Sequence, residues 1–144
     1  MIVLDANLLL YAYDTRATDH KAAGAAITRV FEGPELIGLP WQTILAFLRI
    51  STNARIPGAG LSIEEALAVV QTWIELPQVT VLAPGEKHWG ILQQMLIGGR
   101  VNGLATADAA LAALTIEHGG VLFTTDRGFA RYPGLRFVNP LEES

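Results

Sequence analysis

Three aspartates follow or begin predicted elements of regular structure. Asp5 comes directly after the β-branched run Ile2–Leu4, and Asp126 comes shortly after a second such run, Val121–Thr124. Asp108 lies in the first turn of a predicted Ala-rich helix. In an open parallel sheet, the carboxyl ends of the strands and the starts of the helices that follow share one edge. We therefore expect the three carboxylates to converge at that edge.

Convergent carboxylates favour the chemistry of a hard metal ion. Like charges repel one another, so a cluster of acids is costly to maintain unless a cation offsets the repulsion. Carboxylate oxygens select Mg²⁺ or Mn²⁺ rather than zinc. A cation of this kind activates a bound water and offsets charge on a phosphate, so the expected reaction is hydrolysis of a phosphate ester.

Each acid also has a structural interpretation that the sequence leaves open. Asp5 can cap the turn that follows it, with Asn7 assisting, as short polar side chains commonly do. Asp108 can be an ordinary first-turn acid that interacts with the positive end of the helix dipole. Asp126, just before Arg127-Gly128, can be a turn residue. The joint placement of all three acids favours a site.

Hydrophobic periodicity predicts strands that alternate with helices. We predict strands over Ile2–Leu4, Glu35–Leu39, Val79–Leu82, Val121–Thr124 and Arg136–Val138. We predict helices over His20–Glu32, over Trp41–Arg55 with a break at Ile56-Pro57-Gly58, from a capping box at Ser62 to a stop at Pro77, over Glu86–Ile97 and over Thr106–His118. This alternation predicts an α/β sandwich with a mainly parallel sheet.

Composition narrows the class of protein. The 144 residues suit a single domain, and the 51% hydrophobic content with a mean hydropathy of +0.35 can fill its core. There is no cysteine and no recognisable signal peptide, which predicts a cytoplasmic protein, and no apolar run is long enough for a membrane span. A net charge of −4 and a pI near 5.3 argue against a broad basic face for nucleic acid.

Four segments together resemble the PIN domain, specifically the VapC-type toxin ribonucleases of bacterial VapBC toxin–antitoxin pairs. They are MIVLDANLLLYAYD, LPWQTILAFLRISTN, TADAALAAL and LFTTDRGFARYPGLRFVNP, and their order and spacing span nearly the whole chain. The resemblance implies a single PIN-like domain over residues 1–144 with a three-layer α/β/α sandwich. It also implies a Mg²⁺- or Mn²⁺-dependent endoribonuclease that forms a homodimer and is inhibited by a cognate VapB-type antitoxin.

The resemblance assigns roles to particular residues. Asp5, Asp108 and Asp126 match the family's metal-binding and catalytic acids. Asn7 matches the small polar position that supports the first acid, and Thr124 the polar companion of the last.

Two positions depart from the family pattern. Many members have a Glu on the helix after the second strand, in a pattern resembling T-E-x-x-F-x-R, and T-I-L-A-F-L-R puts Ile44 there. Gly128 stands where relatives often have Asp. Three acids can still hold one hard cation, because Mg²⁺ commonly keeps several waters. Arg49 on the same helix is a candidate phosphate contact, although a surface or carboxylate-pairing role is the simpler interpretation.

Three functional hypotheses follow. The first is a toxin ribonuclease that cuts structured RNA, with tRNA or ribosomal RNA implied by the resemblance. The second is a weakened PIN-like domain that binds antitoxin or RNA without cutting, and retention of Asp5, Asp108 and Asp126 argues against it. The third is a phosphatase with an aspartyl nucleophile, for which a second acid is expected at position 7. Asn7 argues against that class.

Overall fold

The fold is described from a computed structural model that covers residues 1–55 and 60–142. Five strands are present: β1 (Ile2–Leu4), β2 (Ile37–Pro40), β3 (Val79–Leu82), β4 (Val121–Phe123) and β5 (Phe137–Val138). The α-helices are α1 (Ala6–Tyr13), α2 (His20–Glu32), α3 (Trp41–Ser51), α4 (Ile63–Ile74), α5 (His88–Gly98) and α6 (Thr106–Glu117). Two short 3₁₀ helices are η1 (Gly103–Ala105) and η2 (Arg127–Arg131).

The strands form one sheet in the order β3-β2-β1-β4-β5, and every pairing in it is parallel. Strand β1 is central, with Ile2 opposite Ile37 of β2 and opposite Val121 of β4. The chain builds outward from β1 to β3 on one side and then crosses to β4 on the other. This reversal places the topological switch point, where α/β sheets bind ligands, at the carboxyl ends of β1 and β4.

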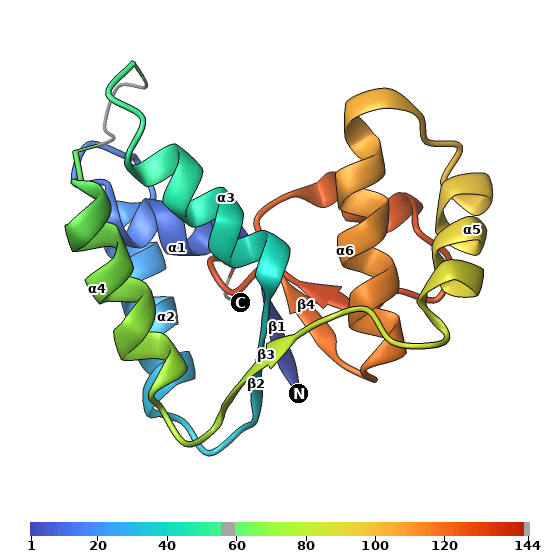
Figure 1. Ribbon diagram of the computed structural model, residues 1–144, viewed down its shortest axis with the longest axis horizontal. Coiled ribbons are helices and arrows are strands. Elements are labelled where there is room, and N and C mark those ends of the chain that lie inside the picture. Colours follow the sequence, from blue (N-terminus) through green and yellow to red (C-terminus); the bar gives the residue numbers. More distant parts are fainter. Residues whose placement is uncertain (56–59, 143–144) are drawn as a thin grey trace.

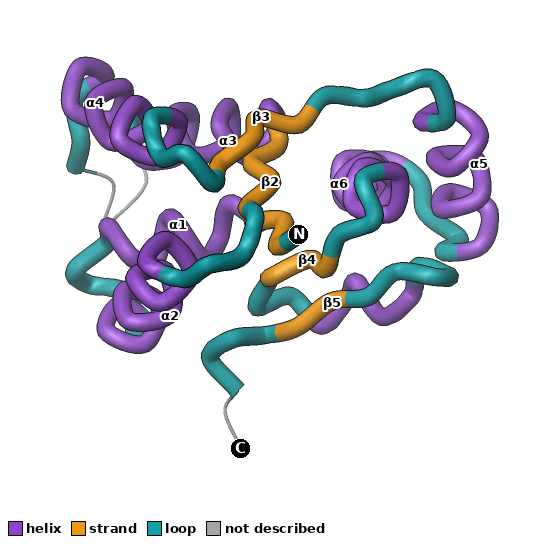
Figure 2. The backbone as a smooth tube through the Cα atoms, turned by 90° about the horizontal axis from the view of Figure 1, so that it is seen from below, coloured by secondary structure: helices purple, strands orange, loops and turns teal. Residues whose placement is uncertain are grey.

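Helices cover both faces of the sheet, which confirms the predicted three-layer arrangement (Figures 1 and 2). Helices α1 to α4 lie on one face, and α5 and α6 lie on the other. The core is correspondingly split, because successive side chains of a strand point to opposite faces. Ile2 and Leu4 of β1 pack with α1 to α4, whereas Val3 packs with α5 and α6. None of the helices in the described residues has the length and apolar character needed to cross a membrane.

The predicted elements differ from the observed ones mainly at their ends. Helix α1 was missed, because the run Leu8–Leu10 continues the apolar character of β1 and conceals a helical period. The strand predicted over Glu35–Leu39 spans Ile37–Pro40, and the side chain of Leu36 just before it is exposed. The helix predicted to reach Arg55 ends at Ser51, and the break expected at 56–58 lies outside the described residues.

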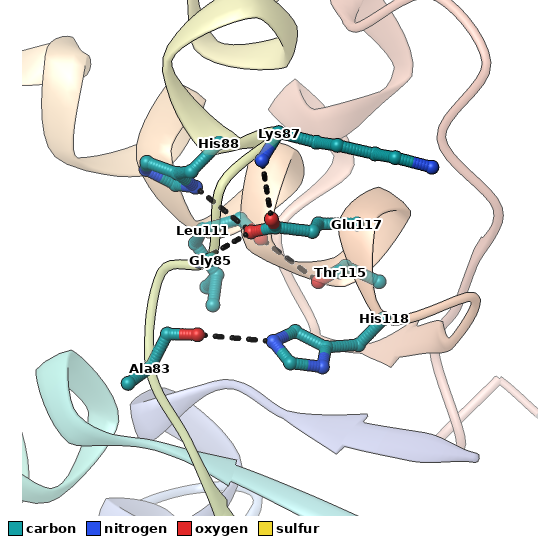
Figure 3. Close-up of polar contacts among 8 residues, drawn as sticks. All are labelled: Ala83, Gly85, Lys87, His88, Leu111, Thr115, Glu117 and His118. Carbon is teal, nitrogen blue, oxygen red and sulfur yellow. Dashed lines mark hydrogen bonds and ion pairs between the residues drawn. The ribbon is translucent and has the colours of Figure 1, made fainter.

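Glu117, near the end of α6, fixes the start of α5 (Figure 3). Its carboxylate accepts hydrogen bonds from the backbone N–H groups of Gly85, at 3.0 Å, and Lys87, at 3.1 Å. The ring Nδ1 of His88 lies 3.6 Å from the same carboxylate. Because Glu117 takes up these backbone donors, α5 begins at His88 instead of at the predicted Glu86. The contact joins two helices on one face of the sheet.

Helix α3 has one face in the core and another directed toward α6. Ile44 and Phe47 are buried in the cluster formed with α1, α2 and α4. Gln42 instead donates from Nε2 to the carbonyl oxygen of Ala107, at 3.0 Å. Two residues along a helix turn by about 200°, so the side chains of Gln42 and Ile44 point to nearly opposite sides.

Replacing Ile44 tests this placement. Ile44→Glu would bury an unpaired carboxylate, so we expect it to lower the free energy of unfolding by about 3 kcal/mol or more. Leu45→Glu is the matched control, since Leu45 is 62% exposed on the same helix, and we expect it to change stability by no more than about 0.5 kcal/mol. Urea denaturation followed by circular dichroism measures both. Equal stability of the two variants would contradict the core position of Ile44.

Candidate functional site

The switch point of the sheet brings together the residues that sequence analysis selected. Asp5 follows β1, and its backbone N–H donates to the carbonyl oxygen of Phe123, the last residue of β4, at 3.1 Å. Thr124 and Asp126 follow β4 directly. Asp108 lies in the first turn of α6. The predicted placement of all three acids at strand ends and a helix start is confirmed.

The hydroxyl of Thr124 is the centre of the polar network. Thr124 is 1% exposed, and its Oγ1 donates to Oδ2 of Asp5 at 2.7 Å. The same oxygen accepts the backbone N–H of Asp126 at 3.0 Å and Nδ2 of Asn7 at 3.4 Å. One hydroxyl therefore links the ends of β1 and β4, the start of α1 and the loop that carries Asp126.

Asp5 also performs the capping role that the sequence left open. Its Oδ1 accepts the backbone N–H of Ala6 at 2.7 Å, at the start of α1. Both carboxylate oxygens are thus held by short hydrogen bonds, one to the helix and one to Thr124. Capping accounts for Oδ1 alone, and a metal-binding role for Asp5 remains a prediction.

Asn7 has one buried oxygen without a partner. Its Nδ2 faces Thr124, but its Oδ1 is buried and forms no hydrogen bond with any described residue. Leaving a buried acceptor unsatisfied costs about 1–3 kcal/mol, so such an atom marks a position where a further donor or cation fits. Asn7 thus contacts Thr124, and its supporting role toward Asp5 remains a prediction.

Asp126 and Asp108 occupy more open positions. Asp126 is exposed and caps η2, accepting the backbone N–H of Gly128 at 2.8 Å. Its turn role is therefore real as well. Asp108 is exposed at the start of α6, the same end of the helix that Gln42 of α3 contacts through Ala107. Helices α3 and α6 come from opposite layers, so Gln42 bridges them across the edge of the sheet.

The pKa values of two of the acids are raised by their surroundings. Burial raises the pKa of the Asp5 carboxyl most strongly, hydrogen bonds from Thr124 and Ala6 lower it, and the charges of Asp108 and Asp126 raise it further. Burial and the charge of Asp126 raise the pKa of Asp108, whereas Arg131 lowers it. The three acids are thus close enough to repel one another electrostatically, which a bound cation would relieve.

The donor set suits a hard cation, but the protein does not supply a complete shell. Carboxylate oxygens and the unpartnered Asn7 Oδ1 are oxygen ligands of the kind that Mg²⁺ takes. Among the described residues, however, no group of three His, Cys, Asp or Glu side chains is arranged to coordinate one ion. A Mg²⁺ ion that keeps several of its waters fits these acids, because it needs few direct protein ligands.

The structure describes the surroundings of Ile44 and reveals residues that sequence analysis missed. Ile44 is buried in the core cluster that includes Leu4 and Leu8, and its apolar side chain offers no ligand atom to a metal ion. Arg49 is exposed on the face of α3 that carries Gln42, two turns further along. Gln42, Arg131 and the buried Tyr132 adjoin the site and were not selected. Finding Gln42 requires knowing which side of α3 faces α6, and finding Arg131 and Tyr132 requires knowing where the chain runs after Asp126.

Comparison with known proteins defines the family. A sequence model of the PIN domain matches residues 2–135, and the chain therefore belongs to the PIN-domain family. Within that family it is similar to Ribonuclease VapC33 of Mycobacterium tuberculosis, to which it is 36% identical over 143 residues, covering 99% of this chain and 100% of that protein.

Solved structures of toxin–antitoxin proteins share the fold. VapBC2 from Rickettsia felis, bound to a DNA fragment from its promoter, aligns with a TM-score of 0.68 at 16% identity, covering 96% of this chain and 98% of that one. Mycobacterium tuberculosis VapC20, described as a toxin that cleaves the sarcin–ricin loop, aligns with a TM-score of 0.68 at 14% identity, covering 94% and 99%.

The raised pKa of Asp5 predicts a pH-dependent stability in the absence of divalent metal. A carboxyl with a raised pKa in the folded state stabilises the fold most at low pH, and that contribution is lost as the pH rises through its folded pKa. At neutral pH we therefore expect Asp5→Asn, which keeps the cap oxygen, to be more stable than the parent by on the order of 1 kcal/mol.

Thermal melts in chelator across a pH series measure this difference, with Asp19→Asn as the control. Asp19 is an exposed acid whose side chain makes no capping hydrogen bond. The gain of Asp5→Asn should shrink as the pH falls below the folded pKa of Asp5, because the parent carboxyl is then protonated too. A loss of stability at every pH would instead show that the hydrogen bonds of Asp5 outweigh its burial.

Proposed function

We propose that this protein is the toxin of a type II toxin–antitoxin pair and a metal-dependent endoribonuclease that hydrolyses phosphodiester bonds in RNA. The observation that carries the proposal is the polar network at the switch point of the sheet, where the Thr124 hydroxyl joins the Asp5 carboxylate to the backbone of Asp126. The charges of Asp108 and Asp126 also raise the pKa of Asp5 there. Similarity to VapC33 over nearly the full length of both chains supports it. We further propose that residues 1–144 act as a single PIN-like domain.

We propose Mg²⁺ or Mn²⁺ as the cofactor, bound by Asp5, Asp108 and Asp126 either directly or through water molecules of its shell. When bound, such an ion lowers the pKa of a water and offsets negative charge on the phosphate. Hydrogen bonds orient two of the three carboxylates. Thr124 and Ala6 donate to the two oxygens of Asp5, and Gly128 donates to one oxygen of Asp126. Asp108, at the start of α6, is left open to solvent.

The residues around the acids define how RNA would approach. The edge of the sheet is open at Asp108 and Asp126, both exposed, whereas Asp5 and Thr124 lie deeper. A phosphate entering from solvent would therefore meet Asp108 and Asp126 before Asp5. Arg49 remains a candidate contact with a more distant phosphate of the RNA. From the family resemblance we propose tRNA or ribosomal RNA as substrate, and hence a cytoplasmic site of action.

We propose a VapB-type antitoxin as partner and a homodimer as the assembly. Helix α5 contains no Asp, Glu, Lys or Arg, and its Trp89 and Ile97 are 68% and 76% exposed. Two copies of such a face can meet without like-charge repulsion, even though each chain carries a net charge of −4. This helix face is the surface we propose for the second copy.

Substitution of the acids tests the nuclease proposal. We expect Asp5→Asn, Asp108→Asn and Asp126→Asn each to lower the rate of RNA cleavage at least a hundredfold, as the loss of a transition-state charge contact does. Asp19→Asn should cleave like the parent. Purified proteins are incubated with total cellular RNA and Mn²⁺, and new 5′ ends are mapped. Parent protein that binds RNA but produces no new ends would support the weakened PIN-like domain instead.

Metal binding has a readout that is independent of cleavage. Mg²⁺ or Mn²⁺ should raise the melting temperature of the parent, because a ligand that binds only the folded state stabilises it by mass action. We expect the rise to disappear in the Asp5→Asn, Asp108→Asn double variant and to persist in Asp19→Asn. Differential scanning calorimetry after chelation measures it. An equal rise in the double variant would place the bound ion elsewhere.

A further inference from the structure

Arg131, the last residue of η2, is held in place by two backbone carbonyls. Its Nε donates to the carbonyl oxygen of Gly99 at 2.9 Å, and its Nη2 lies 3.4 Å from that of Arg100. Arg100 has a φ of 52°, a left-handed conformation that is uncommon outside glycine. Gly99 packs closely on Tyr132, the residue that follows Arg131, since a Cβ added to Gly99 would lie 3.0 Å from the Tyr132 ring. The backbone that holds Arg131 is therefore itself well constrained.

The same segment lies beside the acids. Helix η2 begins at its cap, Asp126, and ends at Arg131. The following residue, Tyr132, is buried, and its hydroxyl lies 3.5 Å from the carbonyl oxygen of Ala105, just before α6. The Asp126 cap and the Tyr132 contact place this segment between the end of β4 and the start of α6, where Asp108 lies. The positive charge of Arg131 also lowers the pKa of Asp108. Arg131 is thus a cation on the segment that runs from Asp126 to the start of α6.

The hydrogen bonds of Arg131 leave part of its guanidinium available. Both bonds use the edge formed by Nε and Nη2. The end formed by the two terminal nitrogens keeps N–H donors, and this fork matches a phosphate. In the part of the chain that the structure describes, Arg131 has no carboxylate oxygen within ion-pair distance.

Arg127, four residues earlier in η2, provides a contrast. Its Nε and Nη2 both donate to Oε1 of Glu142, at 3.2 Å and 2.7 Å, and the pair is exposed. The Arg127 charge is therefore already matched by a carboxylate. Both arginines lie in η2, but Arg127 pairs with a carboxylate, whereas Arg131 contacts only backbone carbonyls in the hydrogen bonds described above.

We propose that Arg131 binds a phosphate of the RNA strand next to Asp108, with the Gly99 and Arg100 carbonyls setting the direction of its guanidinium. This inference rests on the proposed ribonuclease function and adds a phosphate-binding residue to it. Three carboxylates on an acidic protein repel the negatively charged RNA, and a cation beside them would offset part of that repulsion. The competing interpretation is that Arg131 only caps the carboxyl end of α5, where cations are favoured.

Equilibrium binding of RNA separates the two interpretations. Arg131→Gln, Arg131→Lys and Arg127→Gln are each made in the Asp126→Asn background, so that the RNA stays intact in Mg²⁺. Binding of a fluorescein-labelled single-stranded RNA of mixed sequence is followed by anisotropy over a range of KCl concentrations. Thermal melts of each variant record any loss of stability separately, and cleavage of total RNA by the parent tests the underlying function.

We expect Arg131→Gln to weaken binding roughly tenfold or more, as loss of a charged hydrogen bond does. It should also reduce the slope of log affinity against log salt by about 0.7, the value for one phosphate contact on a single strand. Arg131→Lys should restore the slope but not the full affinity, and Arg127→Gln should match the background protein in both.

Unchanged affinity and slope in Arg131→Gln, with a lowered melting temperature, would overturn the proposal and leave the α5 cap as its role. The same fall in slope for Arg127→Gln would also overturn it, because the effect would then be one of general charge. Parent protein that neither cuts nor binds RNA would refute the ribonuclease function itself, a result distinct from failure at Arg131 alone.

Discussion

The hydrogen bond from the Thr124 hydroxyl to Asp5 is the interaction on which the site depends. A hydroxyl has one proton to give, and the Thr124 hydroxyl gives it to Oδ2 of Asp5. The backbone N–H of Asp126 and the side-chain N–H of Asn7 donate in turn to the Thr124 hydroxyl oxygen. In this arrangement Asp5 acts as an acceptor at Oδ2, although burial disfavours its charged form. One buried threonine therefore sets the carboxylate's orientation, opposes its neutralisation and joins the ends of the two central strands.

Helix α6 brings the third acid to this point, and contacts near both ends secure it. Gln42 of α3 reaches the carbonyl oxygen of Ala107 at its start, and Glu117 near its end binds the backbone that leads into α5. The first contact crosses the edge of the sheet between layers, and the second stays within one layer. The contact beside Asp108 is thus made by an uncharged side chain, that of Gln42.

Sequence patterns predicted the features that are set by residues adjacent in the chain. Asp5 and Asp126 could be placed at strand ends because β-branched runs precede them, and the capping box at Ser62 marked the start of α4. The phase of α3 could not be predicted, because its apolar residues surround much of the helix, and only packing decides that Ile44 faces the core and Gln42 faces α6. The contact of Glu117 with Gly85 spans 32 residues and has no local signal.

The sheet order also determines when the acids can meet during synthesis. A chain leaves the ribosome from its N-terminus, so β1 and Asp5 emerge first, whereas Thr124 follows 119 residues later. Until then β1 can pair with β2 only, and the Asp5 carboxylate lacks the hydroxyl that orients it. A growing chain thus carries an incomplete cluster through most of its translation. For a protein proposed to cut cellular RNA, this order delays the assembly of its chemistry until the last strands have been made.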